Sequence, residues 1–131
     1  MIVVDTSVWI DLLNGGDRGP GRRCAELIEA GAPLALTDII LTEVLQGLGS
    51  EREARRVEAH LRAFPILRLE SLDDFSLAAS LYRQARSAGV TIRKTLDCLI
   101  AAPCVRTNAS IFHADADFDR LASCTALRVF S

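Results

Sequence analysis

Short apolar runs recur along the chain, and the first of them, MIVV, is rich in β-branched residues and stops at Asp5. Short continuous apolar runs between polar or turn-forming residues are typical of strands that are buried on both faces. The expected strands cover residues 1–4, 33–36, 66–69, 110–113 and 127–130.

Between these runs the apolar residues follow helical spacing, and polar capping residues mark several of the starting points. Thr37 and Ser71 each precede such a stretch, and Ser50 with Glu53 has the spacing of a capping box. The expected helices cover residues 8–13, 22–30, 38–48, 50–63, 71–88 and 96–106. Pro103 should kink or shorten the last of them, because proline has no backbone N–H to donate. An acidic turn is expected over residues 115–119.

The alternation of strands and helices predicts an α/β fold. Its simplest form is a three-layer α/β/α arrangement, in which helices cover both faces of a short central parallel sheet. No linker, repeat or low-complexity tract interrupts the chain, so we expect a single domain over residues 1–131.

The net charge excludes one way of holding nucleic acid. Fifteen basic residues against seventeen acidic ones give a formal charge of −2, whereas proteins that bind nucleic acid by bulk charge are usually strongly basic. If the substrate is nucleic acid, another source of positive charge must attract the phosphates. A bound divalent cation would supply it.

The cysteines carry no sign of a zinc site, because Cys24, Cys98, Cys104 and Cys124 form no CxxC pair and have no zinc-site spacing. The first residues lack the basic start and long apolar run of a signal peptide. No stretch is long and apolar enough to cross a membrane. We therefore expect a cytoplasmic protein with reduced thiols.

Carboxylates directly follow two of the expected strands. Asp5 comes after the first strand, and Asp115 and Asp117 follow the strand that ends at His113. In open parallel sheets, functional groups gather outside the carboxyl ends of the strands. The structural alternatives are that Asp5 only caps the next helix and that the acids from Asp115 to Asp119 form a solvated loop.

Two further acids lie on apolar helices. Asp97 begins an alanine-rich helix, and the position four residues on is Ala101 rather than a basic residue. Glu43 interrupts the apolar stretch IILTEVLQGL. The helix dipole alone would account for Asp97, and a solvated position at the edge of the apolar stripe would account for Glu43.

Taken together, acids at two strand ends and on two helices can converge at one edge of a parallel sheet. Several oxygen ligands without thiols or imidazoles suit Mg²⁺ or Mn²⁺. Such clusters commonly serve phosphoryl chemistry.

In this order, these residues resemble the PIN-domain family, and within it the VapC toxins of bacterial toxin–antitoxin pairs. The stretch VVDTSVWIDLL is similar to the family's first strand and acid, and LTEVLQGL to the helix with the second acid. TLDCLIAA is similar to the segment with the third acid, and HADADFDRL to the D-x-D-F signature. The resemblance covers nearly the whole chain and implies a three-layer PIN-like domain.

The resemblance also implies roles for individual residues. The catalytic quartet would be Asp5, Glu43, Asp97 and Asp115, of which Asp5, Asp97 and Asp115 would bind metal. Asp117 would be an accessory acid, and Ser7 or Thr6 would orient Asp5 or a metal-bound water.

The implied activity is Mg²⁺-dependent hydrolysis of RNA that leaves a 5′-phosphate and a 3′-hydroxyl, with Mn²⁺ as the other candidate metal. The resemblance further implies a VapB-like antitoxin whose tail blocks the acidic groove, a homodimer of toxin subunits, and contact with DNA only through the antitoxin.

Three positions near the expected cluster have open roles. Many relatives carry threonine where this chain has His113. A histidine there either donates a hydrogen bond to phosphate or to a metal-bound water, or is held by backbone groups at the strand end. Arg93 and Lys94 precede Asp97 and would lie beside the cluster, so we expect them to contact phosphate.

Arginines also gather on the expected helix 50–63, where Arg52, Arg55, Arg56 and Arg62 alternate with Glu51, Glu53 and Glu58. Such mixing is typical of a solvated face. Contact with RNA is the alternative.

Other classes of protein fit less well. A response-regulator receiver domain needs a lysine after its fifth strand, but the only lysine is Lys94, at the start of a helix. A haloacid-dehalogenase-type phosphatase needs a second aspartate two residues after the first, where Ser7 stands. The remaining rival is a PIN-like binding or co-repressor module that acts through its antitoxin and cleaves little. The intact quartet argues against it, because binding alone would not require four acids.

Overall fold

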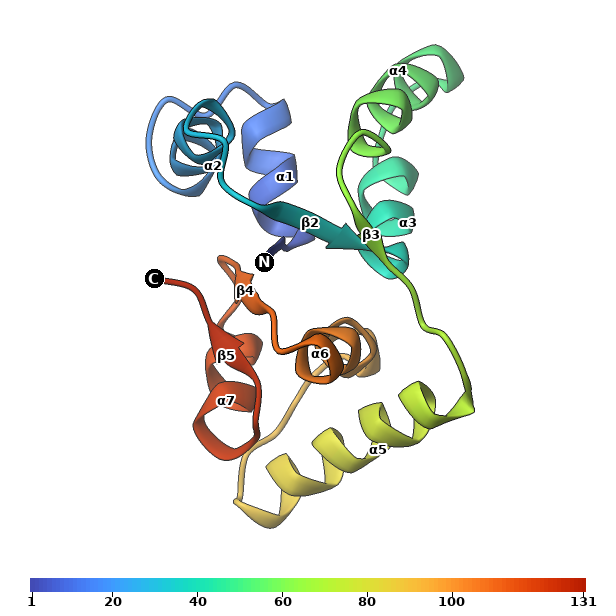
Figure 1. Cartoon of the computed structure of the whole chain (residues 1–131), viewed down its shortest axis with the longest axis vertical. Helices are drawn as coiled ribbons and strands as arrows, with labels where there is room; N and C mark the ends of the chain where they lie inside the picture. Colours follow the sequence, from blue (N-terminus) through green and yellow to red (C-terminus); the bar gives the residue numbers. More distant parts are fainter.

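The computed structural model describes residues 1–131 and contains one five-stranded sheet with seven helices around it (Figure 1). All neighbouring strands pair in parallel, in the order β3-β2-β1-β4-β5. The strands are β1 (Ile2–Val4), β2 (Leu34–Thr37), β3 (Ile66–Leu67), β4 (Ser110–Phe112) and β5 (Arg128–Val129). The α/β class and the parallel sheet predicted from the sequence are confirmed.

The helices form two groups. They are α1 (Thr6–Leu13), α2 (Pro20–Glu29), α3 (Asp38–Gln46), α4 (Glu51–Leu61), α5 (Leu72–Ser87), α6 (Thr95–Thr107) and α7 (Ala116–Cys124). α1 packs against α2 and α3, and α3 against α4, whereas α5 packs against α6 and α7. The groups α1–α4 and α5–α7 lie on opposite sides of the strands, which is the expected three-layer arrangement (Figure 1).

The core lies between the sheet and these helices. All four residues of β2 are buried. Val3 and Val4 of β1 and Ile111 of β4 are fully buried as well. Trp9 packs against Phe64 with the ring centroids 5.3 Å apart. Burial on both faces explains why these strands are continuous apolar runs rather than alternating ones.

The structure differs from two expectations about helices, the acidic turn and the shortening of α6 at Pro103. α7 occupies the region where an acidic turn was expected, because the carboxylate of Asp115 caps the helix by accepting the backbone N–H of Asp117 at 3.0 Å. Pro103 does not shorten α6, which runs from Thr95 to Thr107. The residues on both sides of Pro103 are buried, and their packing offsets the hydrogen bond that proline cannot make.

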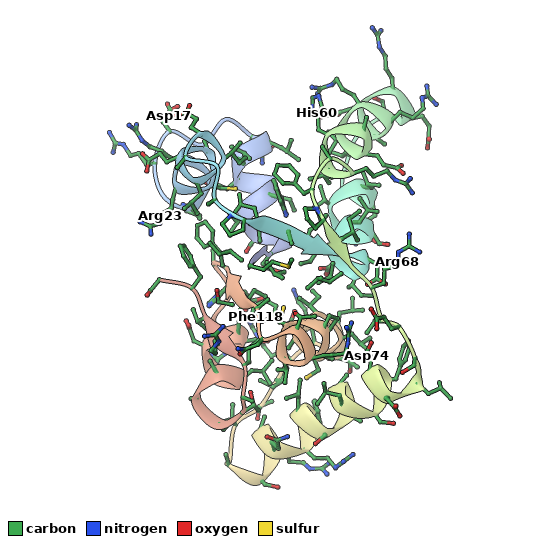
Figure 2. The ribbon with its side chains drawn as sticks, viewed as in Figure 1. Asp17, Arg23, His60, Arg68, Asp74 and Phe118 are labelled. Atoms are coloured by element: carbon green, nitrogen blue, oxygen red, sulfur yellow. The ribbon has the colours of Figure 1, made fainter.

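A buried ion pair joins α5 to α6. Asp74 is buried and accepts hydrogen bonds from Arg106 Nε at 2.9 Å and from the backbone N–H of Glu70 at 2.7 Å. Arg106 also donates to the carbonyl of Arg68 at 2.8 Å, near the labelled Arg68 and Asp74 in Figure 2. The contact fixes α6, the helix that carries Asp97, against the end of β3.

None of the seven helices has the length and hydrophobicity of a membrane-spanning segment. The four cysteines are free, and three of them are buried.

The carboxyl ends of the parallel strands share one edge of the sheet. Asp5 follows β1, Asp38 follows β2, Arg68 follows β3 and His113 follows β4. Side chains that are distant in the sequence therefore meet at this edge, as the rule for open parallel sheets predicts.

Candidate active site

A pocket of about 220 Å³ lies where the carboxyl ends of β1 and β4 meet α3 and α6. It is lined by Asp5, Thr6, Ser7, Ile10, Glu43, Lys94, Asp97 and Asp115. All of these except Ile10 were singled out from the sequence. The fold thus brings the four acids of the expected quartet into one pocket.

Asp97 is the most unusual group in the pocket. It lies in the first turn of α6, is only 4 % exposed, and its Oδ2 atom is buried without a hydrogen-bond partner. The pKa of Asp97 is raised to about 7, mainly by burial and further by the nearby charges of Asp115, Asp5 and Asp117, while Lys94 opposes the rise. An unpaired buried carboxylate is costly unless a cation balances it.

Asp5 both caps α1 and faces the pocket. Its Oδ2 atom accepts the Ser7 hydroxyl at 2.9 Å and the Ser7 backbone N–H at 3.4 Å. Burial raises the pKa of Asp5; the hydrogen bonds from Ser7 and Thr6 oppose this rise, and the charge of Glu43 adds to it. The capping role and a functional role are therefore compatible.

Ser7 connects the two strand ends that carry acids. While its hydroxyl donates to Asp5, its Oγ atom accepts the backbone N–H of Ala114 at 3.2 Å. The loop before Asp115 is thereby held against the end of β1, so the positions of Asp5 and Asp115 are coupled.

Glu43 projects from α3 toward α1. Its Oε1 atom accepts the hydroxyl of Thr6 at 2.7 Å. One oxygen of Glu43 is thus oriented by Thr6, and the residue lines the same pocket as Asp97 and Asp115, which come from α6 and from the end of β4.

His113 is turned inward at the end of β4. Its Nδ1 atom accepts the backbone N–H of Asp115 at 3.0 Å, and its Nε2 atom lies 3.1 Å from Asp119 Oδ1. The ring packs against Phe118 with centroids 5.4 Å apart. Because Nδ1 is an acceptor here, the proton of the neutral ring is on Nε2 and points to Asp119. Both ring nitrogens are engaged within the protein. This arrangement agrees with a residue held at the strand end rather than one that donates to phosphate or to a metal-bound water.

Asp117 is completely buried in the first turn of α7, and arginines hold both of its oxygens. Oδ1 accepts from Arg120 Nη1, and Oδ2 accepts the backbone N–H of Arg93 at 3.3 Å, with Arg93 Nε at 3.6 Å. Burial acts to raise the pKa of Asp117, but the hydrogen bond from Arg120, the backbone of Arg93 and the two positive charges outweigh it and lower the pKa.

Arg93 and Lys94 reach the site differently. The Arg93 guanidinium lies 3.8 Å from Asp115 as well as beside Asp117, and its side chain is 66 % exposed. Lys94 precedes α6 and lines the pocket itself. Arg120 was not singled out from the sequence. Its position three residues after Asp117 on one helix is the signal that could have identified it.

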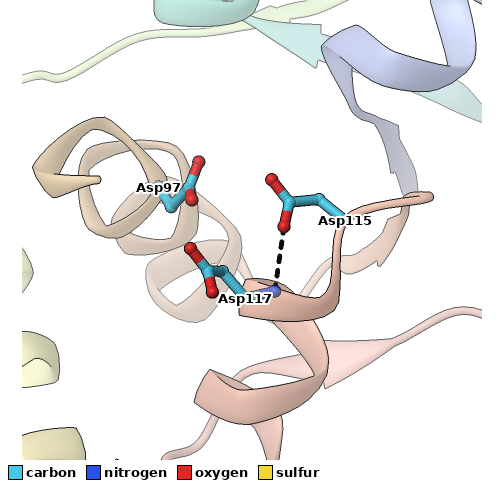
Figure 3. Close-up of side chains that lie close together, drawn as sticks. All are labelled: Asp97, Asp115 and Asp117. Atoms are coloured by element: carbon cyan, nitrogen blue, oxygen red, sulfur yellow. Dashed lines mark hydrogen bonds between the residues drawn. The ribbon is translucent and has the colours of Figure 1, made fainter. Parts of the chain in front are cut away.

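Three carboxylates approach one another most closely. One oxygen each from Asp97, Asp115 and Asp117 lies within 4.8 Å of the others (Figure 3). The trio contains Asp117, whereas the expected metal ligands were Asp5, Asp97 and Asp115. Asp5 lies outside the trio but lines the same pocket.

The site fits a hard divalent cation. Its donors are carboxylate oxygens alone, and the partnerless Oδ2 of Asp97 is the kind of buried group that a cation would satisfy. An acidic cluster in this fold therefore indicates a metal site, without specifying the metal.

Comparison with known proteins identifies relatives along the whole chain. The PIN domain family model matches residues 2–123. The VapC ribonuclease Mb1587 of Mycobacterium bovis is 36% identical over 132 residues, which covers 100% of this chain and 98% of that protein. Ribonuclease VapC11 of Mycobacterium tuberculosis gives the same identity and coverage.

Solved structures share the fold. VapBC2 from Rickettsia felis, bound to a DNA fragment from its promoter, contains a chain with a TM-score of 0.76 and 17% identity, covering 99% of this chain and 98% of that chain. FitAcB from Neisseria gonorrhoeae contains one with a TM-score of 0.75 and 19% identity, covering 100% and 97%. At these identities the likeness concerns the fold.

Proposed function

Because the chain belongs to the PIN-domain family, and within it to the VapC ribonucleases, we propose that it is a metal-dependent endoribonuclease and the toxin of a VapBC-type pair. The observation that carries the proposal is the buried, partnerless carboxylate of Asp97 in a pocket with three other acids. A group of this kind is retained for a cation rather than for stability.

We assign the metal to Asp5, Asp97 and Asp115, with Mg²⁺ as the expected ion and Mn²⁺ as the alternative. We give Asp117 an accessory role, because Arg120 and the backbone N–H of Arg93 already donate to its two oxygens. Its role is to hold those arginines and the start of α7. The carboxylate of Glu43, oriented by Thr6, completes the quartet.

The proposed reaction is hydrolysis of an RNA phosphodiester. The oxygen of a water adds to phosphorus, the bond to the 3′-oxygen breaks, and that oxygen leaves as a 3′-hydroxyl while the 5′-phosphate remains on the other product. A divalent cation, when bound, polarises the phosphate and activates the attacking water. The carboxylate of Glu43 accepts one proton from the attacking water, and the departing 3′-oxygen takes a proton from solvent. Lys94, which lines the pocket, binds a phosphate oxygen.

The proposed partners follow from the relatives. Proteins of this fold have been crystallised in VapBC complexes, and one of these complexes contains promoter DNA. We propose that this chain likewise binds a cognate VapB-like antitoxin, forms a homodimer, and contacts DNA only through the antitoxin. Cytoplasmic residence stays a prediction.

The experiment that tests this function is incubation of total cellular RNA with the purified protein, with Mg²⁺ or Mn²⁺ and with chelator. Discrete fragments that carry 5′-phosphates and form only with metal support the proposal. A folded protein that cuts no RNA under any metal contradicts it and favours the binding-module alternative.

A further inference from the structure

The outward face of α4 carries three arginines without carboxylate partners. Arg52, Arg55 and Arg56 are spaced i, i+3 and i+4, so they project from the same side of the helix. All three are exposed, and none forms an ion pair, whereas Val57 and Leu61 are buried on the other side. We propose that these residues, the α4 arginine face, bind the RNA backbone outside the catalytic pocket; this rests on the proposed ribonuclease function.

A groove with two arginines lies where α3, the end of α4 and β3 meet. Arg62 and Arg68 line a groove of about 480 Å³ together with Asp38 and three apolar residues. Asp38 is held away from the arginines by backbone groups, because its oxygens accept the N–H groups of Ile39 at 2.8 Å and Leu69 at 3.0 Å, and it forms no ion pair with Arg62 or Arg68. Glu58 neutralises Arg62 in part, at 3.0 Å, and Arg68 forms no ion pair.

The groove and the catalytic pocket border the same helix. Asp38 of α3 lines the groove and Glu43 of α3 lines the pocket. Arg68 directly follows β3, at the sheet edge where Asp5 follows β1. Figure 1 shows α4 beside α3, away from α5 at the other end of the molecule. An RNA strand that leaves the pocket and crosses α3 would therefore reach the groove, where Arg62 at the end of α4 leads toward the α4 arginine face.

Nucleic acid fits this face better than a protein partner does. The side chains at its centre are the three arginines and Ala59, so it lacks the apolar core that protein interfaces bury. The glutamates of α4 stand to either side of the arginines rather than between them, because Glu51 and Glu53 each point about 100° away from Arg52 around the helix axis. Planar guanidinium groups bind phosphate oxygens bidentately.

The face also answers the problem posed by the net charge. A chain with a formal charge of −2 does not attract phosphates through its overall charge. It can attract them locally, where its arginines are concentrated and unpaired. Each phosphate contact adds a salt-dependent contribution to affinity, about 0.7 in the slope of log Kd against log salt concentration for a single strand. Three contacts therefore contribute about 2 to the slope.

The test is equilibrium binding of a fluorescent RNA, taken from the cleaved transcript with about twenty nucleotides on each side of the cut, over a range of salt at one fixed Mg²⁺ concentration. All proteins carry Asp97→Asn so that the RNA stays intact. The test variant adds Arg52→Gln, Arg55→Gln and Arg56→Gln. The control adds Arg18→Gln, Arg83→Gln and Arg86→Gln, which removes the same charge from exposed, unpaired arginines elsewhere. Glutamine keeps helix propensity nearly unchanged.

We expect the test variant to lose about 2 from the salt slope and about tenfold in affinity at low salt, while the control keeps the slope of the parent. An unchanged slope in the test variant, or an equal loss in the control, overturns the proposal. A test variant that binds RNA normally but no longer binds the antitoxin would assign the face to a protein partner instead. These results are distinct from failure of the proposed function, in which the parent protein without Asp97→Asn cuts no RNA.

Discussion

Replacement of Asp97 by asparagine should stabilise the metal-free protein at alkaline pH. The folded protein buries the Asp97 carboxylate beside Asp115, Asp5 and Asp117, and leaves its Oδ2 atom without a partner. Ionisation of this group therefore opposes folding. Asparagine keeps the size of the side chain, removes the charge and adds an N–H₂ group that can donate to the neighbouring carboxylates.

The magnitude follows from the two pKa values. The pKa of Asp97 is about 7 in the folded protein, against an ordinary value of 3.8, and each unit of difference corresponds to about 1.4 kcal/mol. Because the folded pKa is the higher one, the folded state binds the proton more tightly. The wild type loses stability as pH rises from about 4 to about 7, and above pH 7 the full cost of about 4 kcal/mol is present.

The assay is chemical denaturation of wild type, Asp97→Asn and the control Asp17→Asn at pH 4 and pH 8, all with chelator. We expect Asp97→Asn to exceed the wild type by up to about 4 kcal/mol at pH 8 and to match it near pH 4. Asp17 is exposed, so its variant should stay within about 0.5 kcal/mol of the wild type. Saturating Mg²⁺ should reduce the difference in the free energy of unfolding between Asp97→Asn and the wild type at pH 8, because the ion stabilises only the wild type. An Asp97→Asn protein that is less stable than the wild type at pH 8 without metal would refute the reasoning.

Two further changes test the supports of the site. His113→Leu removes the acceptor for the Asp115 N–H and should weaken the activation of cleavage by Mg²⁺ about tenfold. His113→Asn can accept the same N–H in an Asx turn and should restore this activation. Equal Mg²⁺ dependence of the two variants would refute the role of His113 in positioning Asp115. Arg106→Ala leaves Asp74 buried without its partner and should cost about 2–3 kcal/mol in denaturation, less than a fully buried pair because Arg106 is partly exposed; a loss under about 0.5 kcal/mol, the scatter of ordinary surface changes, would contradict this.

The convergence of the four acids could be predicted because it depends on chain order and strand direction. Asp5 and Asp115 each follow a strand, and parallel strands end at one edge, so their proximity needed no knowledge of side-chain packing. Asp97 could be suspected because an acid among apolar residues lacked a basic neighbour one turn along the helix. These inferences rest on local pattern alone.

The partners of Asp117 and the orientation of His113 could not be predicted in the same way. Asp117 is held by Arg120 of its own helix and by Arg93 from the segment before α6, a contact set by the packing of α6 against α7. His113 turns inward because Phe118 provides an aromatic surface and Asp119 an acceptor. Both residues belong to α7, a helix that was not predicted because its closely spaced acids indicated a turn. Pro103 was expected to shorten α6 from its local backbone preference alone, but the packing of buried residues around it overrides that preference.

The most direct test of the metal-dependent ribonuclease assignment is the rate of cleavage of one defined RNA as a function of Mg²⁺ concentration, for wild type, Asp5→Asn and Asp17→Asn. We expect the wild type and Asp17→Asn to cut the RNA with the same Mg²⁺ dependence and to lose all activity with chelator. Asp5→Asn should remain folded and lose at least about a hundredfold in rate. Full activity of folded, metal-saturated Asp5→Asn, or cleavage that persists with chelator, would contradict the account.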